Sequence, residues 1–155
     1  MPWEVALKRR DGQPIATIED FRETLPQILP GLQFYREPSG KEKMAAVKIE
    51  FPEFLRNALA NAPAQIQADF EADGLFLRFF FGPEESPRTD HVDIEVRGNG
   101  NPLPHLSAIA RGLDCVVVER SGDELPLTGN ESPEWQKFAQ WRDRTIEKIK
   151  SEPRG

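Results

Sequence analysis

Hydrophobic and polar residues alternate in the middle of the chain, and this period of two is typical of half-buried β-strands. The pattern covers Gln65–Glu71 and His91–Arg97, with a segment between them, Leu75–Phe81, that is apolar on both sides except at Arg78. Asp73-Gly74 supplies a tight turn between the first two segments. The three segments therefore predict an antiparallel meander whose middle strand is central and covered on both faces.

Three further segments have strand character. Trp3–Lys8 alternates, Leu32–Tyr35 is a weak extended segment, and Cys115–Glu119 is rich in β-branched valine. The last segment follows a predicted helix at Leu103–Gly112, so we expect it to join the sheet through a crossover.

Helical spacing of apolar residues predicts the remaining elements. Thr17 is a candidate N-cap with Asp20 three residues later, and Pro26 falls inside the pattern, where it kinks or stops the helix before Pro30-Gly31. Phe51–Ala62 predicts a second helix whose apolar side is Phe54, Leu55 and Leu59. Pro38–Lys43 is polar and is expected to be loop. A last helix is predicted from Ser132 onward, with Trp135 on its apolar stripe and Trp141 at the edge of that stripe.

Length and composition suit one globular unit. The chain has 155 residues, 38% of them hydrophobic and 30% charged. We therefore expect an α+β fold with a mainly antiparallel sheet of about five strands and helices packed on it. Residues 1–150 are predicted to form a single domain and residues 151–155 a disordered tail.

The single cysteine, Cys115, excludes an intramolecular disulfide. The first residues do not resemble a secretory signal, and no apolar run approaches the ~18 residues of a membrane helix. The sequence thus predicts a cytoplasmic protein, and no motif in it implies a cofactor.

Negative charge is concentrated in the predicted sheet. The formal net charge is −6, and Ala64–Glu95 contains eight acids but only two arginines, Arg78 and Arg88. This distribution disfavours nucleic acid as a ligand, because phosphate contacts need clustered Lys and Arg. It permits a basic protein partner. The residues predicted to form that acidic surface are Asp69, Glu71, Asp93 and Glu95. The alternative is an ordinary solvated sheet surface.

The connection from Arg97 to Pro104 is the most distinctive local segment. Its glycines allow close backbone approach, and unpaired N–H groups at the following helix could hold an anion together with Arg97. The candidate binding residues are Arg97, Gly98, Asn99, Gly100, Asn101 and His105. The alternative is a rigid strand-to-helix connection without a ligand.

This segment, RGNGNPLP, resembles an "R-G-x-G-x-P-L-P" loop between a strand and a helix in a group of small uncharacterised bacterial α+β proteins. Phe51-Pro52-Glu53, and Asp73-Gly74 before an aromatic strand, are similar to the same group. The group in turn resembles the compact immunity proteins of bacterial toxin systems. The resemblance spans about Leu32 to Glu124 and implies a fold and a binding role, but no catalytic residue.

Other chemistry finds little support in the sequence. A nucleophilic pair of Cys115 and His105 is disfavoured, because the valines beside the cysteine predict a buried, inert thiol. The two histidines and the cysteine lack the spacing of metal ligands, so no metal site is predicted. The leading hypothesis is a non-enzymatic, immunity-like binding protein whose acidic surface meets a basic protein such as a toxin. The alternative is a small enzyme, or a protein that binds a small molecule or an anion, using the Arg97–His105 loop.

Overall fold

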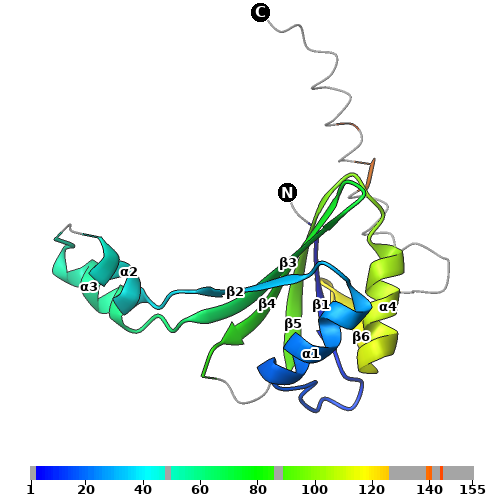
Figure 1. Cartoon of the computed structure of the whole chain (residues 1–155), viewed down its shortest axis with the longest axis horizontal. Coiled ribbons are helices and arrows are strands. Elements are labelled where there is room, and N and C mark those ends of the chain that lie inside the picture. Colours follow the sequence, from blue (N-terminus) through cyan, green and yellow to red (C-terminus); the bar gives the residue numbers. More distant parts are fainter. Residues whose placement is uncertain (1–2, 48–49, 86–88, 126–138, 141–143, 145–155) are drawn as a thin grey trace, which may run out of the picture.

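A computed structural model describes residues 3–47, 50–85, 89–125, 139–140 and 144 (Figure 1). The fold is α+β, as predicted, with six strands where about five were expected. The strands are β1 (Trp3–Lys8), β2 (Gln33–Glu37), β3 (Gln65–Ala72), β4 (Leu75–Pro83), β5 (His91–Gly98) and β6 (Val116–Glu119). The helices are α1 (Ile18–Ile28), α2 (Gly40–Ala46), α3 (Glu53–Ala60) and α4 (Leu103–Leu113).

The strands form one sheet in the order β2-β3-β4-β5-β1-β6, and every neighbouring pair is antiparallel. The predicted meander of β3, β4 and β5 is confirmed. Because β5 and β6 both pair antiparallel with β1, they run parallel to each other. Helix α4 joins them, so the predicted crossover is also present.

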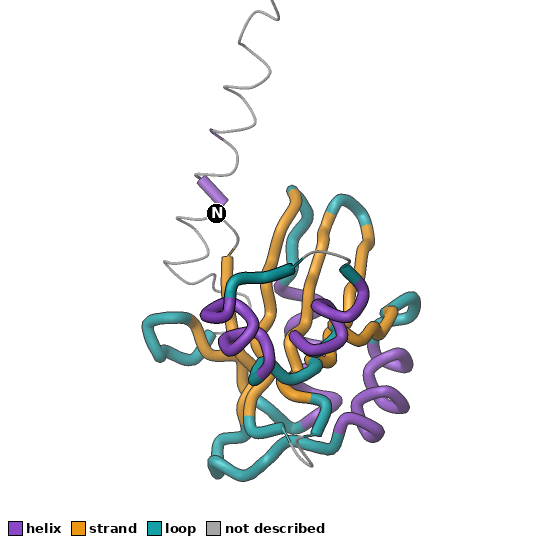
Figure 2. Tube along the Cα trace, turned by 90° about the vertical axis from the view of Figure 1, so that its left-hand side faces the viewer, coloured by secondary structure: helices purple, strands orange, loops and turns teal. Residues whose placement is uncertain are grey.

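One face of the sheet, called the inner face here, carries the hydrophobic core. It bears Leu77 and Phe79 of β4, both fully buried, with buried neighbours on β3, β5, β1 and β6. Phe34 of β2 lies on the same face, half-buried, with its ring 5.3 Å from that of Phe81. Helices α1 and α4 both pack on this face: the ring of Phe21 in α1 lies 5.1 Å from that of Phe81, and His105 in α4 lies 5.2 Å from Phe70. Figure 2 shows the molecule turned by 90° from the view of Figure 1, with the strands in orange and the helices in purple.

Among the described residues, β4 is covered fully on one face and not on both faces as predicted. Its other face, called the outer face here, bears Phe76, Arg78 and Phe80, which are only half-buried. The guanidinium carbon of Arg78 lies 5.3 Å from the centre of the Phe76 ring. A cation over an aromatic face shields apolar surface without a second layer of helices. The apolar run therefore indicated a central strand but not a second layer.

Helix α1 begins as predicted. The backbone N–H of Asp20 donates to Thr17 Oγ1 at 3.2 Å, and Thr17 N–H donates back to Asp20 Oδ2 at 3.4 Å, which completes a capping box. Pro26 does not stop the helix, which continues to Ile28. Pro26 lies two residues before the end of the helix. It removes one backbone hydrogen bond, but little helix follows that could be disrupted.

The expectation of loop at Pro38–Lys43 was wrong, because α2 begins at Gly40. Ser39 is its N-cap: Glu42 N–H donates to Ser39 Oγ at 3.2 Å. Serine followed three residues later by glutamate has the spacing of a capping box. The local signal was therefore present in the sequence, but the segment was interpreted as loop because it is polar.

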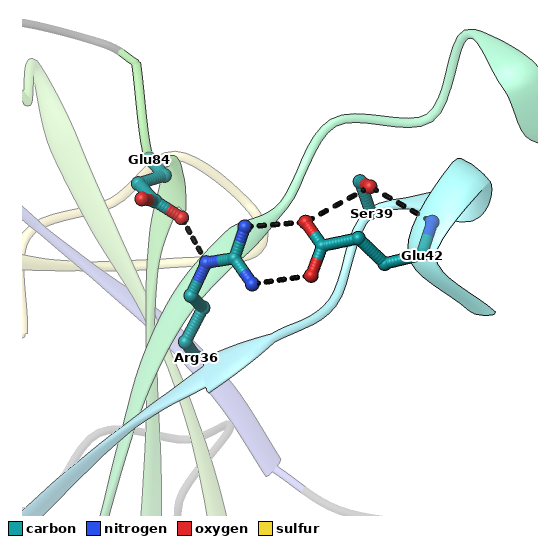
Figure 3. A network of polar contacts seen from close by, with 4 residues as sticks. All are labelled: Arg36, Ser39, Glu42 and Glu84. Atoms are coloured by element: carbon teal, nitrogen blue, oxygen red, sulfur yellow. Dashed lines mark hydrogen bonds and ion pairs between the residues drawn. The ribbon is translucent and has the colours of Figure 1, made fainter. Parts of the chain in front are cut away.

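Helices α2 and α3 form a hairpin that projects from the sheet between β2 and β3; we call residues 38–62 the arm (Figure 1). Arg36 in β2 ties the arm to the body. Its guanidinium donates to both carboxylate oxygens of Glu42, at 2.7 and 2.5 Å, and its Nε donates to Glu84 at the end of β4 (Figure 3). This bidentate bond holds the pKa of Glu42 at about 2, well below its ordinary value.

Helix α3 lies within the predicted segment Phe51–Ala62, but its apolar side is not buried. None of its residues is buried, and Phe54 is 71% exposed. Phe54, Leu55 and Val47 are the large hydrophobic residues that the described part of the chain leaves exposed. The helical period was interpreted correctly, but its apolar side does not contribute to the core.

Most of the predicted C-terminal helix, including Trp135 and Trp141, and the predicted tail at 151–155 lie outside the described residues. Ala139 packs against the core. Among the described residues, no helix combines the length and the apolar character needed to cross a membrane.

Candidate functional site

The four predicted acidic residues all lie on the outer face of the sheet. Asp69 and Glu71 belong to β3, and Asp93 and Glu95 belong to β5. They alternate with buried side chains on both strands and stand in register with outer-face residues of β4, such as Arg78 opposite both Asp69 and Glu95. No described helix packs on this face as α1 and α4 do on the other.

Asp69 is not a bare negative charge. Arg78 Nε donates to Asp69 Oδ1 at 2.9 Å and its terminal nitrogen donates to Oδ2 at 3.2 Å. Tyr35 Oη donates to Gln67 Oε1 at 2.6 Å and lies 3.4 Å from Asp69 Oδ1. Partial burial, and then the charge of Asp69, raise the pKa of Tyr35, so its phenol stays protonated and donates. These residues form a fixed polar network at the β2 side of the face.

The β5 side of the face is more open. Asp93 is 61% exposed and lies 3.6 Å from His91, a neighbour on the same face of the strand as the alternation predicted. Glu95 is 21% exposed and accepts from Arg97 at 3.0 Å. Arg97, which was predicted to belong to a separate anion-binding loop, is therefore bound to the acidic surface.

Glu4 belongs to the same site, although the sequence analysis did not include it. It is directly opposite Glu95 in the β1–β5 pairing. The alternation of Trp3–Lys8 already put Glu4 on a polar face, but only the strand order shows that this strand lies next to β5. Like charges directly opposite each other on a sheet destabilise it, and the bond from Arg97 to Glu95 offsets part of that cost.

A hollow of about 390 Å³ lies beside this pair. Ala6 occupies the position between Asp93 of β5 and Val118 of β6, and its methyl group leaves space where a larger side chain would fill the surface. Phe80 and Val118 add apolar lining. The charged lining residues are four acids and one base: Glu4, Asp93, Glu95, Glu119 and Arg120. The volume falls in the range of about 300–1,000 Å³ usual for ligand sites.

The Arg97–Pro104 loop packs tightly on the β3–β4 turn. Gly98 has φ +91°, and a β-carbon on it would lie 2.0 Å from the carbonyl oxygen of Gly74. Asn99 N–H donates to that same oxygen at 3.0 Å. A β-carbon on Gly100 would lie 2.8 Å from the Leu75 side chain. The glycines are therefore needed for contact between two turns.

The remaining residues of the predicted anion site do not converge. Asn101 Oδ1 accepts from Leu103 N–H at 3.1 Å, which occupies one of the helix N–H groups. His105 packs edge-on against Phe70 of the inner face, whereas Arg97 is bound to Glu95 on the outer face. The structure thus separates Arg97 from His105, and the concave pocket between them on which the enzyme hypothesis depends is not formed by these two side chains.

A larger hollow, of about 700 Å³, lies at the carboxyl end of α4. Two of its arginines are already paired: Arg9 with Asp11 at 2.8 Å, and Arg10 with Glu124 at 2.5 Å. These internal pairs would have to break before the two arginines could bind a ligand.

Cys115 lines that larger hollow, but it is not activated. Burial raises the pKa of its thiol to about 11. His105 lies at the start of α4 and Cys115 just beyond its end, and an 11-residue helix is about 16 Å long. The two cannot form a nucleophilic pair.

Within the described ranges, no three His, Cys, Asp or Glu side chains are grouped as metal ligands would be. Comparison of the chain with models of protein families, with curated proteins and with solved structures finds no match. Any functional inference therefore depends on the geometry of the outer face.

Proposed function

We propose that this protein is a non-enzymatic binding protein whose outer sheet face receives a basic segment of a partner protein. The observation that carries the proposal is the Glu4–Glu95 pair at the edge of the Ala6 hollow. The repulsion between two opposed carboxylates costs at most roughly 0.2–1 kcal/mol, because Arg97 is bound to Glu95 and offsets part of it. An arginine or lysine from the partner placed between them would replace that repulsion with two attractions.

The rest of the face has the composition of a protein interface. Phe80 and Val118 offer apolar surface in the hollow, and Phe76 and Tyr35 lie half-buried nearby on β4 and β2. Protein interfaces combine an apolar or aromatic centre with a charged rim, and the aromatic residues supply much of the affinity. Carboxylates around the hollow would speed encounter with a basic surface and select against an acidic one.

An immunity-type role, in which this chain binds and blocks a basic toxin, is the most specific form of the proposal. It rests on the acidic outer face and on the resemblance of the Arg97–Pro104 segment to a group of small bacterial α+β proteins, which in turn resembles immunity proteins. A gene for a basic toxin beside the gene for this chain would support this form directly.

The test uses a basic probe of known composition. We would titrate the full chain, labelled with ¹⁵N, with a short synthetic peptide of alternating arginine and leucine. We expect amide shifts at Glu4, Ala6, Phe80, Asp93 and Glu95. Affinity should fall as the Debye length is reduced from about 30 Å to about 8 Å by added salt.

Two matched variants make the test specific. Glu4→Gln/Glu95→Gln should weaken binding about tenfold or more, because it removes both carboxylates of the opposed pair. Glu19→Gln/Glu23→Gln, on the exposed side of α1, removes the same formal charge elsewhere and should leave binding nearly unchanged. Equal loss in the two variants, or shifts confined to another face, would show that the outer face is not the binding surface.

A further inference from the structure

The two edge strands of the sheet, β6 and β2, differ in whether a further segment of the described chain pairs with them. Residues 123–125 turn back along β6: Leu125 N–H donates to the Val117 carbonyl at 2.7 Å, and Glu119 N–H donates to the Asp123 carbonyl at 2.8 Å. At the opposite edge, β2 pairs only with β3 among the described residues. Edge strands are usually protected by shortness, charge, proline, a bulge or a covering segment. Strand β2 is short, and its two charged residues, Arg36 and Glu37, are paired with Glu42 and Lys43 of the arm. Within Gln33–Glu37 there is no proline, and its pairing with β3 contains no bulge.

We propose that β2 pairs antiparallel with β2 of a second copy of this chain, about a two-fold axis that passes beside Tyr35. This pairing extends the six-stranded sheet across the axis. An edge with unpaired N–H and C=O groups is the usual template for such addition, and a two-fold axis makes the contact self-limiting.

The sequence of β2 favours one register. When Tyr35 faces Tyr35, Glu37 faces Gln33 of the second copy and Arg36 faces Phe34, so no like charges meet. If the two-fold axis passed beside Arg36 instead of Tyr35, Arg36 would lie opposite Arg36 of the second copy, which is unfavourable. A register shifted by one residue, or by any odd number, would place outer-face side chains of one copy beside inner-face side chains of the other. Burial on the inner face excludes this arrangement.

The arm supplies a second, independent reason for a second copy. It leaves the sheet at Glu37, which in this pairing lies opposite Gln33 of the second copy. It therefore continues past the end of that strand and alongside the body of the second copy. The exposed hydrophobic residues Val47, Phe54 and Leu55 all lie on the arm. The arm has four basic and three acidic residues, a net charge of +1, whereas the chain as a whole carries −6, so the arm approaches the second copy without net repulsion.

Cysteine cross-linking tests the axis. In a Cys115→Ser background, which has no native thiol, Tyr35→Cys would place two thiols opposite each other within the reach of a disulfide. Gln33→Cys is the matched control: residue 33 of the two copies would be displaced by four residues, about 14 Å along the strand. We expect Tyr35→Cys to form a covalent dimer at least tenfold faster than Gln33→Cys under mild oxidation. Equal rates would overturn the proposal.

Sedimentation of the chain with native thiols provides a second measurement. Gln33→Glu would place glutamate opposite Glu37 at two symmetric positions and weaken the dimer roughly fivefold, whereas Gln33→Lys would strengthen it by a similar factor. Gln33→Glu/Glu37→Gln exchanges the two side chains without changing net charge and should restore association. Phe54→Ser should weaken it without unfolding the body. A chain that stays monomeric up to about 1 mM would overturn the proposal and assign the edge to a different protein.

Discussion

Gly40 and Leu59 bring α2 and α3 into contact at a separation that only glycine permits: a β-carbon on residue 40 would lie 1.7 Å from the Leu59 carbonyl oxygen. Gly40 N–H also donates to the Ala62 carbonyl at 3.0 Å. The arm therefore holds together through backbone contact, although its helices bury few large side chains.

Gly40→Ala should open the arm hairpin. The added methyl group has no space, and overpacking of this kind costs about 1–3 kcal/mol. We expect faster amide hydrogen exchange throughout α2 and α3, with exchange in β4 and β5 unchanged. Lys41→Ala, in the same turn but exposed, is the control and should change stability by less than about 0.5 kcal/mol. If the two variants behave alike, the close contact does not hold the arm.

Glu42 should titrate at an unusually low pH. Arg36 holds its pKa at about 2, so the carboxylate remains paired as the pH falls below the ordinary value of 4.5 and loses its partner only near pH 2. The stabilisation that this pair gives to the attachment of the arm is therefore complete above about pH 4.5, and it is lost progressively as the pH falls from there to about 2. A carboxyl ¹³C titration checks this. Arg36→Gln should return the midpoint to about 4.5, and an unchanged midpoint would show that the arginine is not the cause.

Glu4→Gln should stabilise the protein while weakening binding. Removal of one carboxylate from the opposed pair relieves like-charge repulsion, and we expect roughly 0.2–1 kcal/mol more stability in urea unfolding. Residues kept for binding often carry a stability cost of this sign. Lower stability in Glu4→Gln than in the parent would mean that the pair is not repulsive in the folded chain.

Cys115 should be slow to alkylate in the folded protein. A pKa of about 11 leaves on the order of a hundredfold less thiolate at pH 8 than the ordinary value of 9.0. We expect the iodoacetamide rate to rise about a hundredfold on unfolding in urea, and to increase steadily with pH up to about 11 in the native state. A fast native reaction with a midpoint near neutrality would instead indicate an activated thiol.

Phosphate should not bind the Arg97–Pro104 loop. The glycines serve the contact with the β3–β4 turn, and Arg97 is engaged by Glu95. Titration with inorganic phosphate should therefore leave the amides of Gly98 to Leu103 unshifted, and Gly98→Ala should lower stability through its φ of +91° and its clash with Gly74. Saturable shifts at these amides would restore the anion hypothesis.

Local patterns predicted most of the elements because their causes are local. The capping box at Thr17 and the Asp73-Gly74 turn are decided by residues a few positions apart. The site depended on strand order, which the sequence did not determine. Glu4 and Glu95 are far apart in the chain and become neighbours only because β1 enters the sheet beside β5.

The errors have a common physical origin. The two-sided apolar run of β4 suggested two layers, but Arg78 covers Phe76 without a second layer. The apolar side of α3 suggested burial, but a projecting hairpin exposes it. In both cases periodicity identified the type of element correctly, while the surroundings of that element depended on distant parts of the chain.

Because the described helices that pack on the sheet, α1 and α4, cover its inner face, inner-face and outer-face positions along β4 and β5 meet different physical requirements. Ile94 must stay apolar for the chain to fold, whereas Asp93 and Glu95 beside it are free of that requirement. Outer-face positions 76, 78, 80, 93 and 95 can therefore change in sequence while the intervening inner-face residues continue to specify the same fold.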